Sequence, residues 1–467
     1  MDRKFKYLVK NVGILTISNF ASKIMVFLLV PLYTSVLSTE EYGTYDLVVS
    51  TVQVVFPLLT LNIVDAVMRF AMDKSKSIDE IATIGLRYII RSCIPITFFL
   101  IICNTVSIFN NIKGYELLIG LYFGFYVFNQ FLIQFAKGLE QVIPMGIAGI
   151  LSTIFLVVGN IVFLVVLKNG LQGFFVANIL CQAISGIYLS YKIKLWRYIR
   201  TWKINQSLQK EMLLYCLPLI FTTLSWWINN MSDKYAVALI CGTAANGILS
   251  VSYKIPSILN TIQQIFIQAW QISAIKEYGE EETKKFYGDT FCYINLLMCF
   301  CCSVLILLTK FLATLLFAND FYAAWEYVPF LLIASVFNSA SGLLGPILLA
   351  VKDSKNMAKS ALYGAIFNIV FNIILICVIG IQGAAVATAI SSYIIYHIRK
   401  KAVGDKIVID SYWKVLFSWV IICIQATFEI FSINKLFQLF LILLIILINI
   451  EYIKKMTYII RQFLKKR

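Results

Sequence analysis

The sequence reads Gly170-Leu171-Gln172-Gly173-Phe174-Phe175-Val176-Ala177 at one point and, 210 residues further on, Gly380-Ile381-Gln382-Gly383-Ala384-Ala385-Val386-Ala387. Five of the eight positions are identical, in the same register. Each copy follows one long apolar run and begins another, so each predicts a corner between two helices. A corner that recurs at this distance indicates a chain built from two similar lobes. In a membrane protein, two parallel lobes around a central cleft are typical of a transporter.

The composition places the chain in a membrane. Of its 467 residues, 60% are hydrophobic and only 14% are charged, far more apolar than a soluble domain requires. A helix that spans a bilayer needs about 20 predominantly apolar residues, and runs of this kind predict an all-α integral membrane protein with about 14 spans. The spans are expected at 11–34, 45–67, 83–108, 115–136, 143–167, 171–191, 212–233, 243–270, 288–309, 324–350, 360–379, 382–398, 413–430 and 436–453.

The distribution of basic residues predicts the orientation of these spans. If the N-terminus is cytoplasmic, the cytoplasmic segments hold 31 of the 40 Lys and Arg residues, and the opposite side holds five. Because Lys and Arg concentrate in cytoplasmic loops, this imbalance predicts that both termini lie in the cytoplasm. The net charge of +16 is then explained by basic loops that face an anionic inner leaflet, without a nucleic-acid partner.

Signals of an enzyme or a metal site are missing from the sequence. The eleven cysteines lie almost all within apolar runs, and His397 is the single histidine. Their spacing matches no set of metal ligands, so the cysteines are interpreted as small packing residues. There is no pair of candidate catalytic carboxylates and no glycine-rich nucleotide loop. We therefore expect a protein without catalytic residues, bound metal or cofactor, although coupling to an ion gradient stays open.

The eighth expected span carries an unusual polar stripe. Its polar residues recur every three or four positions, which places them on one face of a helix. A face of this kind cannot contact lipid, because each polar group would lose its hydrogen-bonding partners. It therefore predicts contact with a hydrated cavity, or, as the plainer alternative, hydrogen bonds to other helices. The stripe consists of Ser250, Lys254, Ser257, Thr261, Gln264, Gln268 and Gln271.

Other spans carry polar faces that would line the same cleft if the lobes meet face to face. Polar residues three or four apart occur in the first, second, fourth and seventh spans. Together with the stripe of the eighth span, they give the predicted cavity-lining set: Asn19, Asp65, Tyr126, Asn129, Gln130, Asn229, Asp233, Ser257, Thr261 and Gln264.

Most charges within or next to the spans are positive. A charged residue inside a membrane costs about 2.5–3.5 kcal/mol on insertion scales, so it usually has a function. Cations of one sign on neighbouring turns repel each other unless an anion lies between them, and arginine suits phosphate or pyrophosphate. The alternative of a structural ion pair, with Asp65 or Asp233, or of a side chain that reaches the interface stays open. The candidate anion-binding residues are Lys23, Arg69, Arg87, Arg91 and Lys254.

Several short stretches resemble the polysaccharide flippases, the Wzx-type O-unit transporters. The resemblance extends from the first to the twelfth span. Its residues are Pro31-Leu32-Tyr33-Thr34, Ser38-Thr39-Glu40-Glu41-Tyr42-Gly43, Asp233-Lys234-Tyr235, Val251-Ser252-Tyr253-Lys254 and the corner from Gly380 to Thr388.

The resemblance implies the fold of the multidrug/oligosaccharidyl-lipid/polysaccharide exporter superfamily. That fold has two pseudo-symmetric six-helix bundles followed by a C-terminal helix pair. The expected parts are an N-terminal lobe at 1–195, a basic cytoplasmic linker at 196–210, a C-terminal lobe at 211–400, and helices 13 and 14 with a basic tail at 401–467. The isoleucine- and leucine-rich sequence of the last spans suggests plain lipid-facing anchors.

The same resemblance implies a substrate and a place in the cell. The substrate would be a polyprenyl-pyrophosphate-linked oligosaccharide, moved by alternating access across the bacterial cytoplasmic membrane for a surface polymer such as O-antigen. Partners would be membrane lipids, the polymerase and the chain-length machinery. By position, the family pattern carries over to Lys23, Arg69, Lys254 and the pair Asp233 and Lys234, whereas Arg87 and Arg91 rest on their depth in the membrane.

Two other functions remain as alternatives. A cation-coupled drug exporter of the same superfamily would need an acidic coupling residue in the first span, where this chain has Lys23. A membrane glycosyltransferase or polysaccharide polymerase would need catalytic carboxylates on a sizeable external loop. The external loops expected here are short, which disfavours that class.

Overall fold

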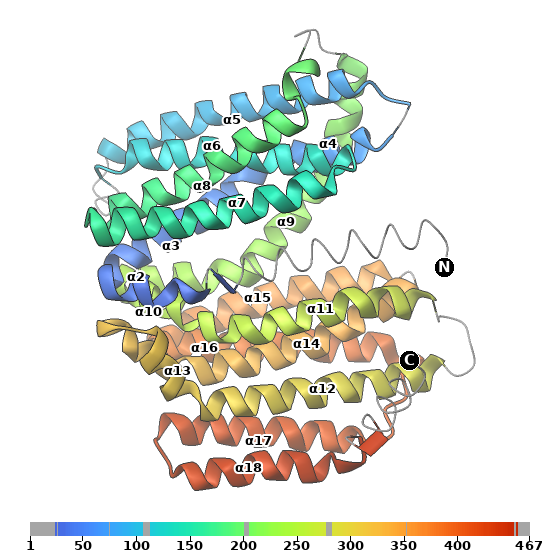
Figure 1. The fold of residues 1–467 in the computed structure, drawn as a ribbon. Helices are drawn as coiled ribbons and strands as arrows, with labels where there is room; N and C mark the ends of the chain where they lie inside the picture. Colours follow the sequence, from blue (N-terminus) through green and yellow to red (C-terminus); the bar gives the residue numbers. More distant parts are fainter. Residues whose placement is uncertain are drawn as a thin grey trace. The chain divides into compact units, whose positions relative to one another are not determined.

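The computed structural model describes residues 24–25, 27–73, 75–105, 113–199, 205–276, 283–351, 353–452 and 454–455. Every regular element in these ranges is a helix, so the predicted all-α class is confirmed (Figure 1). By its internal contacts the chain divides into two compact units, Met1–Trp227 and Ile228–Arg467.

Unit 1 contains a bundle of helices around an aromatic and aliphatic core. Phe123, Phe131 and Phe135 of α6 are fully buried there. α6 packs against α4, α5 and α8, and α8 also packs against α7. The elements are α2 (Val30–Val36), α3 (Thr39–Leu59), α4 (Ile63–Ala71), α5 (Ile78–Thr105), α6 (Glu116–Gly138), α7 (Val142–Asn160), the π-helix η2 (Ile161–Val166), α8 (Gly170–Lys192) and the 3₁₀-helix η3 (Leu195–Arg197).

Unit 2 is built around α14, whose residues are almost all buried. α14 packs against α11, α12, α15, α16 and α17. The elements are α10 (Thr243–Ser252), α11 (Lys254–Lys276), α12 (Thr283–Leu307), α13 (Thr309–Leu316), the 3₁₀-helix η4 (Asn319–Glu326), α14 (Val328–Ala350), α15 (Ser354–Ile379), α16 (Ile381–Val403), the 3₁₀-helix η5 (Gly404–Lys406), α17 (Tyr412–Ile430) and α18 (Lys435–Ile448).

The boundary between the units lies within one long helix, α9 (Gln206–Cys241). The first turns of α9 pack on unit 1: Leu208 and Met212 are buried in its core, and Gln209 Nε2 donates to Tyr88 Oη at 2.7 Å. The described end of the basic segment, from residue 205 to residue 210, therefore packs on unit 1. The predicted division at 1–195 and 211–400 stays a prediction.

In both copies of the repeated motif, the first glycine has a positive φ at the start of a helix. Gly170 has φ +49° and begins α8, and Gly380 has φ +62° and caps α16. Glycine adopts such angles without the steric cost of a Cβ. The second glycine of each copy lies where two helices meet closely. A Cβ on Gly383 would lie 2.3 Å from Leu375 O, and one on Gly173 would lie 2.9 Å from Phe163 O. Both corners are thus explained by conformation and close packing.

The second expected span is broken near its end. α3 and α4 meet at an angle of 62°, where Leu61 and Asn62 have left-handed backbone angles (φ +52° and +53°). Pro57 in the last turn of α3 has no N–H for the helix ladder, which favours a break here.

The eighth expected span is also two helices rather than one. The helix is interrupted at Tyr253, which separates α10 from α11. Pro256, in the first turn of α11, cannot donate to residue 252 and disfavours a continuous helix. The predicted polar stripe from Ser250 to Gln271 is therefore divided between α10 and α11, and its contact with a cavity stays a prediction. Ser250 is buried on α10, where its hydroxyl lies 3.4 Å from Asn246 Oδ1.

Nine helices in the described part of the chain are long and apolar enough to cross a membrane, and the bent pair α3 and α4 makes a tenth. Most of the first expected span lies outside the described residues. α9, the pair α10 and α11, and the 14-residue α18 cover the seventh, eighth and fourteenth expected spans but are not among the ten.

The last two helices are not plain lipid-facing anchors, so that expectation is wrong. α17 lies beside α12 and α18 (Figure 1), and it also packs against α14. Along α17 the buried side chains include Lys414, Ser418, Gln425 and Glu429. The expectation rested on the isoleucine- and leucine-rich sequence of the last spans and did not take these polar positions of α17 into account. The helix pair is therefore an integral part of unit 2.

Candidate functional site

A polar cluster occupies the break between α3 and α4. Asp65 Oδ2 accepts a hydrogen bond from Asn62 Nδ2 at 2.8 Å, and its Oδ1 accepts one from Gln134 Nε2 of α6 at 3.0 Å. The thiol of Cys216 donates to Asn62 O at 3.4 Å. Gln134 Oε1 is buried and has no partner among the described residues. Asp65 thus lies in the first turn of α4, directly after the break, and accepts hydrogen bonds from two amide groups.

Part of the predicted polar face of α6 forms hydrogen bonds to α8 within unit 1. Asn129 Nδ2 donates to Gln182 Oε1 at 2.6 Å, and Asn129 Oδ1 accepts from Ser185 Oγ at 3.0 Å. Both polar atoms of Asn129 therefore join α6 to α8. Tyr126 lies against Phe56 of α3, with ring centroids 5.6 Å apart. Gln130 is half-buried.

The cations of α4 and α5 lie on accessible faces. Arg69 is exposed in the last turn of α4, and Arg87 is half-buried. Arg91 is exposed on the same side of α5 as Ile94 and Phe98, opposite the buried Ile89 and Ile96. Its guanidinium carbon lies 5.9 Å from the ring centroid of Tyr88. Beyond Arg91, the exposed residues Ile94 and Phe98 on this side of α5 are apolar.

In unit 2, the structure brings together the Asp233 motif within α9 and Tyr253, which follows α10. Tyr253 donates its phenolic hydrogen to Asp233 Oδ2, and the backbone N–H of Lys234 donates to Asp233 Oδ1 at 2.9 Å. Asp233 is buried. Lys254 directly follows Tyr253, is half-buried, and is the first residue of α11. Lys254 therefore begins α11 directly after the residue that binds Asp233.

A buried polar network adjoins Asp233 in sequence. Ser232 Oγ donates to Asn368 Oδ1 of α15 at 2.6 Å. Asn368 Nδ2 donates to Ser391 Oγ of α16 at 3.0 Å, and Asn372 Nδ2 donates to Asn368 Oδ1 at 2.9 Å. Sequence reasoning missed this network. The spacing of two asparagines four apart in an otherwise apolar span was the available signal.

The polar face of α11 points away from the core of its unit. Ser257 and Gln264 are exposed and Thr261 is half-buried, whereas Ile255 and Leu259 are fully buried. The hydroxyls of Ser257 and Thr261 donate to the backbone oxygens of Lys254 and Ser257 at 2.5 and 2.8 Å. These side chains need no other helix to satisfy their donors.

Three predicted residues cannot be placed. Asn19 and Lys23 lie outside the described residues, and so does the side chain of Asn229.

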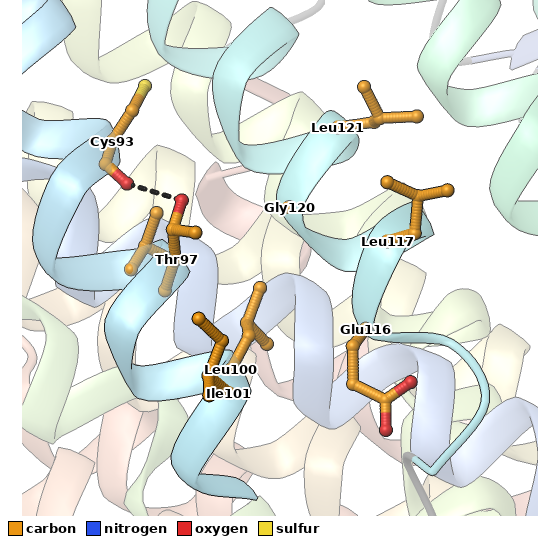
Figure 2. Close-up of a pocket in the computed structure, with 9 residues that line it drawn as sticks. Cys93, Thr97, Leu100, Ile101, Glu116, Leu117, Gly120 and Leu121 are labelled. Atoms are coloured by element: carbon orange, nitrogen blue, oxygen red, sulfur yellow. Dashed lines mark hydrogen bonds between the residues drawn. The ribbon is translucent and has the colours of Figure 1, made fainter. Parts of the chain in front are cut away.

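An open apolar groove of about 600 Å³ runs between α5 and α6. Figure 2 shows its two walls: Cys93, Thr97, Leu100 and Ile101 from α5, with Leu117 and Leu121 from α6. The hydroxyl of Thr97 donates to Cys93 O at 2.8 Å. Its donor is therefore already used within α5. Glu116 lies at one end. None of the predicted site residues lines this groove, whose surface suits a hydrocarbon chain better than a sugar.

The described residues of these clusters supply cations, amides and hydroxyls. In the described ranges, no three His, Cys, Asp or Glu residues lie close enough to hold a metal ion. The accessible cations of unit 1 and Lys254 of unit 2 can attract an anion.

Comparison with solved structures identifies the fold. An inward-closed lipid II flippase MurJ matches with a TM-score of 0.69 and 16% identity, over 96% of this chain and 99% of that one. An inward-facing multidrug resistance MATE transporter of the MOP superfamily matches with a TM-score of 0.65 and 15% identity, over 88% and 99%. A MOP superfamily transporter from Pyrococcus furiosus matches with a TM-score of 0.58 and 14% identity, over 90% and 96%. The chain thus has the MOP-superfamily fold.

Comparison of sequences identifies the family. No curated protein sequence matches the chain significantly. The model of the family described as polysaccharide biosynthesis protein matches residues 8–271, more than half of the 467 residues. The match covers the helix break at Asp65, the motif at Asp233 and the polar face of α11. The chain therefore belongs to the polysaccharide biosynthesis protein family.

Proposed function

We propose that the protein flips a polyprenyl-pyrophosphate-linked oligosaccharide from the inner to the outer leaflet of the bacterial cytoplasmic membrane, by alternating access. The observation that carries the proposal is membership of a polysaccharide biosynthesis family in a chain whose fold is that of membrane transporters, one of them a lipid II flippase. The product would be a surface polysaccharide, with the polymerase and chain-length machinery acting downstream. Both termini would lie in the cytoplasm.

The cations are proposed to hold the pyrophosphate. Lys254 is the best supported, because it begins α11 directly beside the contact between Tyr253 and Asp233 and precedes the accessible polar face. Lys23, Arg69 and Arg87 complete the proposed set. Arg91 belongs to it if the apolar strip of α5 borders the substrate. A charged hydrogen bond contributes about 1.5–3 kcal/mol, so each direct contact should matter roughly ten- to a hundredfold.

The test is export of surface polymer in cells that lack the native gene. Lys254→Ala should lower the export rate about tenfold or more, and Lys254→Arg should retain most of it, because arginine keeps the charge. Lys210→Ala, an exposed lysine in the first turns of α9, is the matched control and should export normally. Lys23→Ala and Arg91→Ala extend the series.

Two outcomes would contradict the proposal. Wild-type export by both Lys23→Ala and Lys254→Ala at normal expression would show that these cations are structural. Drug resistance conferred by the chain, without restored polymer export, would favour the drug-exporter alternative. That alternative is the one to test because the fold is similar to that of MATE transporters.

A further inference from the structure

Two hollows lie side by side on α5. The larger, of about 600 Å³, is the groove between α5 and α6 described above. The second, of about 400 Å³, is more open. Both are lined by Cys93, Thr97 and Ile101. Residues four apart lie on one face of a helix, so these three side chains form a ridge that the hollows share.

The residues that belong to one hollow alone lie on opposite sides of this ridge. Ile96 and Leu100 line the groove, whereas Ile94 and Phe98 line the second hollow. Each residue of a helix is turned by about 100° from the one before it, which places the two pairs to either side of the ridge. The two hollows therefore suit a lipid with two hydrocarbon chains better than a lipid with one.

The length of the hollows matches one leaflet of a bilayer. From Cys93 to Ile101, α5 rises by about 12 Å at about 1.5 Å per residue, and half of a hydrocarbon core of about 30 Å is about 15 Å. With both termini in the cytoplasm, as proposed above, α5 runs towards the outer surface. The hollows would then lie in the outer leaflet.

A charged group lies at one end of the groove. Glu116, the single charged residue among those that line it, is half-buried in the first turn of α6. Figure 2 shows its carboxylate at the same end of the groove as Leu100 and Ile101. Glu116 Oε2 accepts a hydrogen bond from the backbone N–H of Gly114 at 2.9 Å. Lys113 directly precedes that N–H and is exposed, so a cation borders the same end.

We propose that the two hollows bind an aminophospholipid of the outer leaflet, such as phosphatidylethanolamine. Its two acyl chains lie on the two sides of the ridge, its ammonium group donates to the Glu116 carboxylate, and its phosphate is attracted by Lys113. A primary ammonium carries three N–H donors, and a carboxylate can accept several. Lysine binds phosphate as a point charge. The site does not depend on which substrate the protein transports.

The charges at this end favour an aminophospholipid over other lipids. An anionic phospholipid, or a polyprenyl pyrophosphate, brings negative charge towards Glu116 without a cation to offset it, and like charges repel. The quaternary ammonium of phosphatidylcholine has no N–H to donate. A head group with a primary amine and one phosphate matches both Glu116 and Lys113.

Photolabelling of the purified full-length protein tests the site. The protein is placed in phosphatidylcholine vesicles with a trace of phosphatidylethanolamine that carries a photoreactive group in one acyl chain, and labelled peptides are identified by mass spectrometry. Label should appear at residues 93–101 and 116–121. Unlabelled phosphatidylethanolamine should displace it about three to ten times more effectively than phosphatidylglycerol, as expected for one charged hydrogen bond near the surface.

Two variants separate the head group from the chains. Glu116→Gln keeps an acceptor for the N–H of Gly114 but removes the charge, so the two lipids should compete equally. Gly120→Leu fills the groove, because a Cβ on Gly120 would lie 3.4 Å from Leu100 Cδ1, and it should lose most of the label on α6.

Each variant has a matched control that should label like the wild type. Glu326→Gln removes an exposed acid on η4. Gly124→Leu adds the same side chain to α6 at a position outside the groove lining, where a Cβ would meet nothing within 4 Å.

Three results would overturn the proposal. Equal competition by the two lipids in the wild type would indicate ordinary contact with the bilayer, and a preference that persists in Glu116→Gln would exclude the carboxylate. Stronger displacement by a polyprenyl phosphate than by phosphatidylethanolamine would assign the groove to the transported substrate. If Gly120→Leu does not fold, the comparison of the wild type with Glu116→Gln decides.

Discussion

At the scale of single residues, the repeated glycines have two separable roles. The first glycine of each copy supplies a left-handed backbone angle, and the second lets one helix approach its predecessor. Gly383→Ala should lower the free energy of unfolding by about 1–3 kcal/mol, the usual cost of overpacking, because the added methyl meets the backbone of Leu375. Gly124→Ala on α6 is the control: its Cβ would meet nothing within 4 Å, so it should be neutral or stabilising. Chemical unfolding in detergent measures both, and equal effects would refute the close-contact explanation.

Asp65 provides a residue-scale test of the helix break. Asp65→Asn replaces one acceptor oxygen by an NH₂ group that faces the donor of Asn62 or Gln134. Leaving a buried donor without an acceptor costs about 1–3 kcal/mol. The same measurement should show that loss for Asp65→Asn and little change for Asp320→Asn, whose side chain is exposed. An unchanged stability in Asp65→Asn would mean that the cluster does not hold α4 to α6.

At the scale of elements, the sequence predicted the long apolar helices but not the points at which they break. The apolar runs predicted the all-helical fold because the bilayer sets the length of a span. The breaks at Asn62 and Tyr253 depend on one proline each and on contacts with distant helices, such as Tyr253 with Asp233. For the same reason, the sequence indicated polar residues on α6 but not that Asn129 would pair with Gln182 and Ser185.

A substitution in α17 tests whether this helix is an integral part of unit 2 or the lipid-facing anchor that the sequence predicted. Gln425 accepts from Ser303 Oγ and donates to Ser303 O at 2.9 Å, fully buried against α12. Gln425→Leu should destabilise the protein by about 1–3 kcal/mol, because it leaves polar groups of α12 unpaired. Phe417→Leu, at an exposed position of α17, should have little effect. If Gln425→Leu were stabilising, α17 would be the simple apolar anchor that its neighbours in sequence suggest.

At the scale of the whole molecule, alternating access requires that one polar face meets water during the cycle. Ser257, Thr261 and Gln264 are on the side of α11 away from the core of unit 2, and a polar side of this kind suits water better than lipid. In a variant without the eleven native cysteines, a cysteine at each of these positions should react with a membrane-impermeant thiol reagent. Thiols react as thiolates, which form in water and not in lipid. Ile373→Cys, exposed on the apolar face of α15, should therefore stay unlabelled. Locking the transporter inward or outward should change the side from which labelling occurs. Protection of all three positions in both states would exclude α11 from the transport path, and with it the role proposed for Lys254.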